Sequence, residues 1–310
     1  LLVENGIVND VIYSKKYILR IFAVTKYLKK ENPDWVIAYQ ESPSLIACLA
    51  KLLGGKFKLM VSERNTTQYI GINEKIRFIL YRFANKIVPN SFSQEKFIKD
   101  NYPNLSNKIT TITNFVDLDK FSFYPKKHNT TKSLIVVVAT VWRPKNTLGL
   151  IESVRILSER NHSFKIEWYG IIEGHEQYLN SCNELINKYN LHEYIKLLPK
   201  THEIHEKYRL CDYFCLPSFY EGTPNVICEA ISTGRPVICS NVCDNPIYVK
   251  DGYNGFLFNP NDPKDIANKI EQALLSSTED YHIMCKNSRD LAEGLLSENI
   301  FIEKYINLLK

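Results

Sequence analysis

The sequence predicts an α/β protein with two doubly wound domains of parallel sheet, and three features predict it. Short apolar segments alternate with amphipathic ones along the chain, which is the pattern of strands linked by helices. A polar segment at 124–132 (YPKKHNTTK) interrupts that pattern, which then restarts. A chain of 310 residues also exceeds what one ordinary hydrophobic core accommodates. We therefore expect domains at residues 1–125 and 126–285, followed by helical residues 286–310.

The first domain alternates helices and strands from its first residues. Its expected strands are 35–39, 58–62, 86–91 and 110–114. Its expected helices are 14–30, 43–53, 73–84 and one that Ser93 caps. The chain opens on LLVENGIVND, which lacks the Met and the basic start of a secretion signal and is typical of the middle of a domain. We expect the first domain to be incomplete at its N-terminus.

The second domain repeats the alternation with more strands. Its expected strands are 134–140, 164–170, 194–199, 213–216, 236–239 and 255–258. Its expected helices are 148–160, 176–189, 204–210, 223–234, 263–275 and 279–309. Ligands of such sheets bind beyond the carboxyl ends of the strands, so we expect the site in a cleft between the two domains.

Composition narrows the class of protein. With 24% charged and 45% apolar residues, and no apolar run near the roughly 20 residues of a membrane-spanning helix, the chain is expected to be a soluble globular protein. The eight cysteines are scattered and lack the paired spacing of zinc ligands. Buried reduced thiols, and therefore a cytoplasmic location, are the expectation, with no metal.

Charge is concentrated in the first domain, where residues 1–125 hold 18 Lys and Arg against 11 Asp and Glu. This excess favours an anionic partner, such as a phospholipid surface or a lipid-phosphate acceptor, although ordinary solvated charge gives the same pattern. Residues 74–87 (EKIRFILYRFANKI) form an amphipathic helix that either lies on an anionic membrane or packs its apolar face on the sheet. We expect no nucleic acid partner.

The stretch 213–240 predicts one strand, helix and strand unit with an anion site at its centre. Thr223 can cap the helix, and Pro224 suits the first helical position because no backbone donor is missed there. Helix amides that follow a strand through Gly222 are a ready site for phosphate. Two acids flank this site, Glu221 before the helix and Glu229 within it.

Several motifs in order along the chain resemble those of one enzyme family. They are Ser218–Asn225 with Glu229-Ala230 and Gly234–Ile238, Lys145-Asn146, Asn114–Asp117 with Phe121, Asp251-Gly252 with Asn254–Leu257, and Ser62–Asn65. The first of these is similar to the E-x7-E region of the retaining glycosyltransferases of family 4, also called glycosyl transferases group 1. The Ser62–Asn65 motif is similar to one found in members that build bacterial surface polysaccharides.

The resemblance implies a GT-B architecture, in which two Rossmann-like domains face a cleft and residues 286–310 return to the first domain. It implies a donor site made of Thr140, Arg143, Lys145, Glu221, Gly222, Thr223, Pro224, Asn225 and Glu229. Lys145 and the amides after Glu221 would stabilise the diphosphate leaving group as its charge grows. Glu221 would accept hydrogen bonds from hydroxyls of the donor sugar, and Glu229 would accept two from a ribose.

The sequence departs from the family's pattern in two places. The family carries an Arg where this chain has Thr140, and Arg143 either replaces that Arg or does not. The family often has a His where Arg64 and Asn65 stand, so Arg64 either takes a catalytic, acceptor-side role beside Asn65 or pairs with an acid. The segment Asp117-Leu118-Asp119 spells a metal-binding D-x-D, but the family has a hinge there, and we expect no metal.

These features predict a retaining, metal-independent and cofactor-free glycosyltransferase, cytoplasmic or peripheral on the cytoplasmic face of a membrane. It would transfer a hexose-type sugar from a nucleotide diphosphate to a lipid-linked or saccharide acceptor in capsule, exopolysaccharide or O-antigen assembly. Two alternatives stay open. A sugar-nucleotide epimerase shares the architecture but needs no acceptor, and a non-catalytic nucleotide-sugar or glycan-binding module follows if the first domain is truly incomplete.

Overall fold

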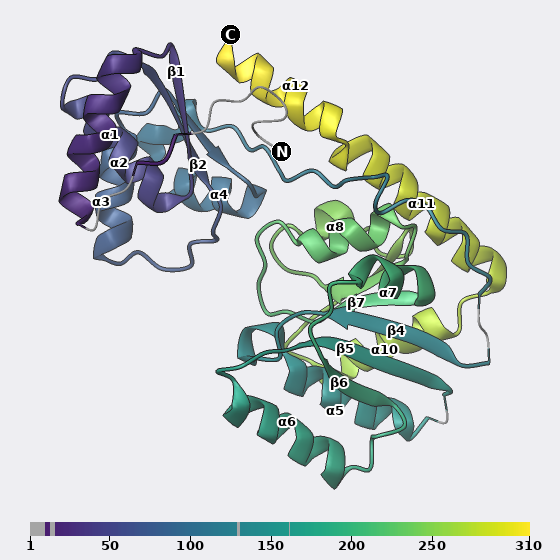
Figure 1. Cartoon of the computed structure of the whole chain (residues 1–310). Helices are drawn as coiled ribbons and strands as arrows, with labels where there is room; N and C mark the ends of the chain where they lie inside the picture. Colours follow the sequence, from purple (N-terminus) through teal and green to yellow (C-terminus); the bar gives the residue numbers. More distant parts are fainter. Residues whose placement is uncertain (1–9, 13–15, 129–130, 161) are drawn as a thin grey trace. The chain divides into compact units, whose positions relative to one another are not determined.

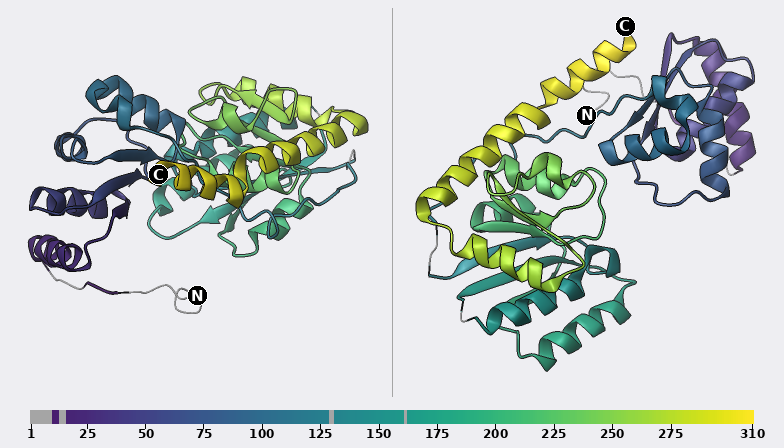
Figure 2. Two further views of the ribbon diagram at one scale, coloured as in Figure 1. Left: turned by 90° about the horizontal axis from the view of Figure 1, so that it is seen from above. Right: turned by 180° about the vertical axis from the view of Figure 1, so that it is seen from behind.

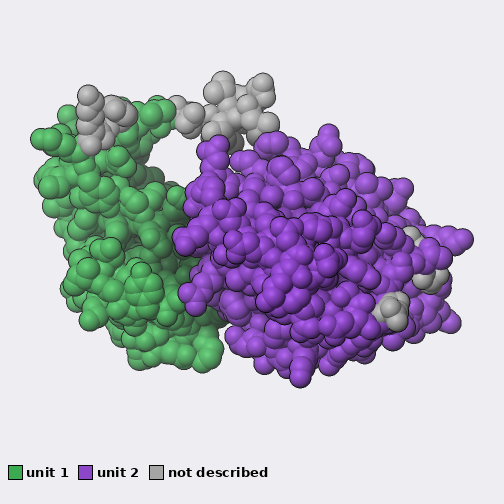
Figure 3. Space-filling view, turned by 90° about the horizontal axis from the view of Figure 1, so that it is seen from below, with its two compact units in different colours: residues 1–112, 305–310 green, residues 113–304 purple. Residues whose placement is uncertain are grey.

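The computed structural model describes residues 10–12, 16–128, 131–160 and 162–310 (Figure 1). The chain divides into two compact units, unit 1 with residues 1–112 and 305–310 and unit 2 with residues 113–304 (Figure 3). The division falls before the expected boundary at 125, because Val116 and Phe121 already pack in the core of unit 2. The expected helix start at Ser14 and residues 129–130 of the expected linker lie outside the described residues.

Unit 1 is built on a parallel sheet in the order β1-β2-β3. The strands are β1 (Trp35–Tyr39), β2 (Lys58–Glu63) and β3 (Lys86–Pro89). The helices are α1 (Tyr17–Glu31), α2 (Glu41–Leu52), α3 (Ile72–Tyr81), α4 (Phe92–Asn101) and the 3-10 turn η1 (Pro103–Lys108). Leu59, Val61 and Ile87 of the strands pack with Phe78 and Tyr81 of α3, so the sheet and α3 share one core.

Unit 2 is a parallel sheet in the order β6-β5-β4-β7-β8-β9. Its strands are β4 (Ser133–Val138), β5 (Phe164–Ile171), β6 (Ile195–Pro199), β7 (Tyr213–Leu216), β8 (Val237–Ser240) and β9 (Gly255–Phe258). The chain starts in the middle at β4, adds β5 and β6 on one side, and then passes to the other side for β7, β8 and β9. Sheets with such a reversal bind their ligands beyond the carboxyl ends of the strands where the order changes, which are β4 and β7 here.

Helices cover both faces of this sheet (Figures 1 and 2). The helices after β4 are η2 (Arg143–Lys145), α5 (Thr147–Ser158), α6 (Glu176–Lys188), α7 (Ile204–Leu210), α8 (Asn225–Ser232), α9 (Asn245–Tyr248), α10 (Pro263–Leu274) and α11 (Thr278–Leu296). The last helix, α12 (Glu298–Leu309), does not cover the sheet, and its residues from Tyr305 onward belong to unit 1. Ile135 and Val137 of β4 enter a core with α5, α6 and α10, whereas Val136 between them enters a second core with α7 and α8. Successive side chains of this buried strand therefore enter two different cores, one on each face of the sheet.

Some expected elements differ in the structure. The expected strand 110–114 is not a full strand, although Thr110 and Ile112 donate backbone hydrogen bonds to Ile87 and Pro89 beside β3. The expected helix 279–309 is two helices, because Ser297 has an extended backbone between α11 and α12. Helix α4 begins earlier than expected, since Ser91 and not Ser93 caps it by accepting from the Gln94 amide at 3.2 Å.

Two further expectations concern the cysteines and membrane-spanning helices. All eight cysteines are free, and every one except Cys243 is buried, as the scattered pattern predicted. Burial raises the pKa of the buried thiols, for example that of Cys48 to about 12, so these thiols are not reactive. Among the described residues, no helix is both long and apolar enough to span a membrane.

Candidate active site

The segment after β4 carries the first group of predicted site residues. It is held against β5, because Val141 donates to the Gly170 carbonyl at 3.0 Å and a Cβ on Gly170 would lie only 1.8 Å from the Ala139 oxygen. It then forms the turn η2, which ends at Asn146 in the left-handed region (φ 58°). Asn146 donates from Nδ2 to the Pro260 carbonyl at 2.8 Å. The position of Lys145 is therefore fixed on both sides.

The segment after β7 runs beside it. Phe219 donates its backbone N–H to the Pro144 carbonyl at 3.0 Å, so the two segments are joined next to the side chains of interest. Lys145 Nζ lies 2.6 Å from Glu221 Oε1. The lysine side chain is 27% exposed and that of the glutamate 12%, so this pair faces solvent only in part. A cation and a carboxylate predicted from distant motifs thus meet beyond the carboxyl ends of β4 and β7.

The start of α8 differs by one residue from the expected one. The helix begins at Asn225, and Pro224 occupies the cap position with no side-chain hydrogen bond there. The Pro224 carbonyl accepts from the amides of Ile227 at 2.9 Å and Cys228 at 3.1 Å. Thr223 is therefore not the cap. Together with Gly222 it forms the approach to the helix, and both are half-buried.

Glu229 lies one turn into α8 and is largely enclosed. Its Oε2 accepts a hydrogen bond from the hydroxyl of Tyr208 at 3.0 Å. Burial raises the pKa of Glu229, and the hydrogen bond from Tyr208 and the charge of Lys120 offset this in part. Sequence reasoning missed Tyr208, because a tyrosine in the short apolar pattern of α7 indicates only a core position.

Arg143 and Thr140 occupy different environments. Thr140 follows β4 and is half-buried, whereas Arg143 opens η2 and is exposed. Within the part of the chain that the structure describes, the Arg143 guanidinium makes no hydrogen bond or ion pair. Arg143 is therefore a cation near Lys145 that can pair with an anion. The Thr140 hydroxyl carries no charge. Asn225, at the first position of α8, accepts from Asn114 Nδ2 at 2.8 Å.

Arg64 and Asn65 lie in unit 1, directly after β2. The Arg64 guanidinium lies 4.9 Å from the centre of the Tyr39 ring, and its Nη2 donates to the Tyr305 hydroxyl at 3.1 Å. Asn65 is exposed, and its Nδ2 lies 3.4 Å from Glu41 Oε1. Two tyrosines of unit 1, Tyr39 and Tyr305, therefore contact the Arg64 guanidinium.

The D-x-D segment has a local structural role. Asp117 Oδ1 accepts the backbone N–H groups of Asp119 at 3.1 Å and Lys120 at 2.9 Å, which closes a turn. No group of three or more His, Cys, Asp or Glu side chains suited to a metal ion occurs among the described residues.

The fold is that of known glycosyltransferase structures. A glycosyltransferase from Rickettsia africae superimposes with a TM-score of 0.84 at 20% identity, covering 100% of this chain and 86% of that one. HepE from Anabaena, in its complex with UDP, gives a TM-score of 0.86 at 17% identity, covering 99% and 87%. The two parallel sheets and this likeness define a protein of GT-B architecture, as the sequence predicted.

The family follows from the sequence of unit 2. Residues 120–291 match the family described as Glycosyl transferases group 1, and they are more than half of the 310 residues, so the chain belongs to this family. It is a glycosyltransferase. An Escherichia coli relative named UDP-Gal:alpha-D-GlcNAc-diphosphoundecaprenol alpha-1,3-galactosyltransferase is 28% identical over 87% of this chain and 73% of its own length.

A second relative extends the comparison to another organism. The Campylobacter jejuni N,N'-diacetylbacillosaminyl-diphospho-undecaprenol alpha-1,3-N-acetylgalactosaminyltransferase is 23% identical over 93% of this chain and 79% of its own length. Both matches are longer than the family region at 120–291, so the likeness is not confined to it.

Proposed function

We propose that the protein transfers a hexose-type sugar from a nucleoside diphosphate to a lipid-diphosphate-linked saccharide, with retention of anomeric configuration and without a metal ion. The named relatives support the substrate class, since one takes a UDP-sugar and both act on sugars linked to diphosphoundecaprenol. The acceptor belongs to the assembly of a bacterial surface polysaccharide.

One observation carries the donor side of this proposal. Lys145 and Glu221 are in contact at 2.6 Å beyond the ends of β4 and β7, where the sheet changes direction. A nucleotide diphosphate binds at such a point with its phosphates toward fixed donors. Lys145 and Arg143 supply cationic charge there, and Gly222 lets the chain approach closely, so charge that develops on the leaving diphosphate is stabilised without a metal.

The two glutamates take different roles because their surroundings differ. Glu221 is oriented by Lys145 and reaches solvent, so it accepts hydrogen bonds from hydroxyls of the donor sugar. Glu229 lies deeper and is oriented by Tyr208, so it accepts from the ribose hydroxyls. Neither carboxylate has to form a bond to the sugar. The departing phosphate oxygen takes the acceptor proton on the same face of the sugar ring, which yields retention.

Unit 1 supplies a surface for a lipid-linked acceptor. We place α3 on an anionic membrane, because a row of apolar side chains on this helix and the loop before it is exposed: Tyr69 (77%), Ile72 (71%), Ile76 (48%) and Ile79 (52%). Lys75 and Arg82 beside them are also exposed and complement anionic headgroups. Phe78 and Tyr81 of the same helix are instead buried in the core of unit 1.

The test is a transfer assay on the full-length protein. UDP-galactose, UDP-glucose and their N-acetylamino counterparts are each combined with short-chain alkyl diphosphates that carry GlcNAc or GalNAc, in buffer with excess EDTA. We expect one pair to give acceptor-dependent release of UDP and a product whose new linkage is α by proton NMR.

Each component of the proposal has its own contrary result. A β-linked product excludes retention, and loss of turnover in EDTA excludes metal independence. Release of UDP and an epimerised free sugar without acceptor indicates the epimerase. Binding of UDP-sugars with no turnover on any acceptor indicates a binding module.

A further inference from the structure

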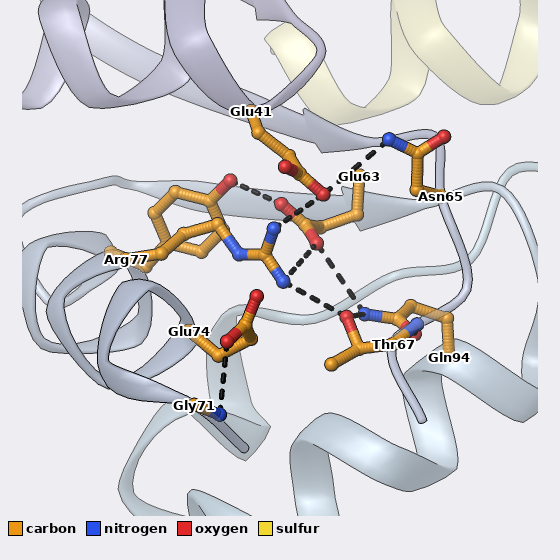
Figure 4. A network of polar contacts seen from close by, with 9 residues as sticks. Glu41, Glu63, Asn65, Thr67, Gly71, Glu74, Arg77 and Gln94 are labelled. Carbon is orange, nitrogen blue, oxygen red and sulfur yellow. Dashed lines mark hydrogen bonds and ion pairs between the residues drawn. The ribbon is translucent and has the colours of Figure 1, made fainter. Parts of the chain in front are cut away.

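The edge of unit 1 where β1 and β2 end carries a buried network of polar side chains (Figure 4). Glu63 is the last residue of β2, and Glu41 is the first residue of α2, directly after β1. The Gln40 amide between β1 and α2 donates to the Ser62 carbonyl at 3.1 Å, which ties the two strand ends together. Both carboxylates therefore belong to the edge at which parallel sheets bind their ligands.

Arg77 of α3 connects the two carboxylates. Its Nη1 lies 2.5 Å from Glu41 Oε1, and its Nη2 lies 3.5 Å from Glu63 Oε2. Nη2 also donates to Thr67 Oγ1 at 2.9 Å. The arginine side chain is only 4% exposed, so it is fixed from several directions and cannot turn outward without breaking buried contacts. Figure 4 shows the guanidinium between the two acids.

The two acids differ in exposure and in the number of their partners. Glu63 is fully buried, accepts from the hydroxyl of Tyr81 and lies 3.4 Å from the Gln94 Nε2 donor. Burial raises the pKa of Glu63, and Arg77, Tyr81 and Gln94 partly offset this. Glu41, by contrast, has a side chain that is 39% exposed. Within the described residues its contacts all fall on Oε1, and Oε2 has none.

An exposed carboxylate whose orientation is fixed by a buried arginine is suited to accept hydrogen bonds from neutral hydroxyl groups. Its uncontacted oxygen can accept two hydrogen bonds, and a carboxylate acceptor makes stronger ones than a neutral group. The amide of Asn65, 3.4 Å from the same carboxylate and exposed, adds both a donor and an acceptor. Neighbouring hydroxyls of a pyranose present this combination of donors and acceptors.

We propose that Glu41 and Asn65 bind hydroxyl groups of the terminal sugar of the acceptor, and that Arg77, supported by Glu63 and Thr67, is a positioning residue for Glu41. This inference rests on the proposed function, because it assigns the acceptor sugar to unit 1. It adds to the predicted acceptor-side pair a residue, Glu41, that no motif indicated, and it leaves Arg64 anchored between two tyrosines.

The experiment uses the full-length protein and the donor and alkyl-diphosphate acceptor on which the wild type turns over. Glu41→Gln keeps the volume and removes the charge, and Asn65→Ala removes the amide. For Glu41→Gln we expect the acceptor KM to rise about tenfold to a hundredfold, the loss of a hydrogen bond to a charged group. For Asn65→Ala we expect a rise of about twofold to tenfold, the loss of a neutral hydrogen bond. The donor KM stays at the wild-type value in both variants. The melting temperature stays at the wild-type value in Asn65→Ala and falls in Glu41→Gln, because Arg77 loses one of its two carboxylate partners. Glu31→Gln removes another exposed carboxylate from unit 1 and serves as the matched control.

The outcomes distinguish a failure of this inference from a failure of the proposed function. An unchanged acceptor KM in Glu41→Gln, with normal turnover, overturns the role of Glu41 and leaves the proposed function standing. A lowered melting temperature with no change in KM assigns Glu41 to structure only and overturns the inference as well. A wild type that transfers to no acceptor overturns the proposed function, and the acceptor role of Glu41 falls with it.

Discussion

At the scale of single residues, the site depends on carboxylates in unlike surroundings. Glu221 has a cation 2.6 Å away, which holds it in place. Glu229 accepts a hydrogen bond from the neutral hydroxyl of Tyr208, and burial raises its pKa. In the role proposed for it, Glu229 accepts hydrogen bonds from two ribose hydroxyls, and for this the carboxylate has to be ionised when the nucleotide binds.

This raised pKa predicts a pH dependence of donor binding. An acid with a raised pKa becomes protonated at a higher pH than an ordinary glutamate, so UDP affinity should fall as the pH decreases toward that pKa and recover above it. Titration calorimetry with UDP between about pH 5 and pH 8 measures this. Glu229→Gln should bind weakly and with little dependence on pH. A wild-type affinity that rises as the pH falls contradicts the assignment.

At the scale of elements, close packing against β5 fixes the position of the loop that leads from β4 to Lys145. Trp168 Nε1 donates to the Ala139 carbonyl at 2.6 Å, and Gly170 lies against the same residue. Any side chain at 170 would meet the backbone that leads to Lys145. The loop is therefore positioned by β5.

Gly170→Ala tests this arrangement. Because the added Cβ would lie 1.8 Å from a backbone oxygen, the loop after β4 has to shift. We expect a loss of about 1–3 kcal/mol in the free energy of unfolding and weaker UDP binding. Chemical denaturation and calorimetry measure the two effects. Gly294→Ala is the control for a glycine that is lost without a steric clash, since a Cβ there meets nothing within 4 Å. Equal behaviour of the two variants contradicts the account.

Much of the fold could be predicted from sequence because buried parallel strands are continuous apolar runs. The runs that became β4 and β7 were placed within two residues of their observed bounds. Lys145 and Glu221 could be singled out by motif, but their contact joins residues 76 positions apart and depends on strand order. Arg77 and Tyr208 were missed for a related reason: each lies in an ordinary helical pattern, and only the packed structure gives it a carboxylate partner.

At the scale of the whole molecule, the two units differ in what they offer a ligand. Unit 2 contributes fixed charges at a switch point, and unit 1 contributes a basic surface with an exposed apolar row on α3. The acceptor in the proposed function carries a lipid diphosphate and remains in a membrane, so that function places the enzyme at the membrane surface. Marginal apolar area and several cations together are sufficient for reversible binding.

Vesicle sedimentation measures this binding. We expect wild-type protein to sediment with vesicles that contain phosphatidylglycerol and much less with pure phosphatidylcholine. The double variants Ile72→Ser/Ile76→Ser and Lys75→Gln/Arg82→Gln should each reduce the bound fraction, because apolar burial and charge both contribute. Ile283→Ser, at an exposed isoleucine of unit 2, is the control. Binding that is indifferent to all three contradicts the role of α3.

The central claim is that Glu221 serves the reacting sugar and Glu229 the nucleotide, and one comparison tests it most directly. Steady-state turnover and UDP affinity are measured for Glu221→Gln and Glu229→Ala in the full-length enzyme. The account predicts that Glu221→Gln lowers kcat about a hundredfold or more with UDP affinity nearly unchanged, while Glu229→Ala mainly weakens UDP binding, about tenfold. Wild-type turnover and UDP affinity in both variants would contradict the site.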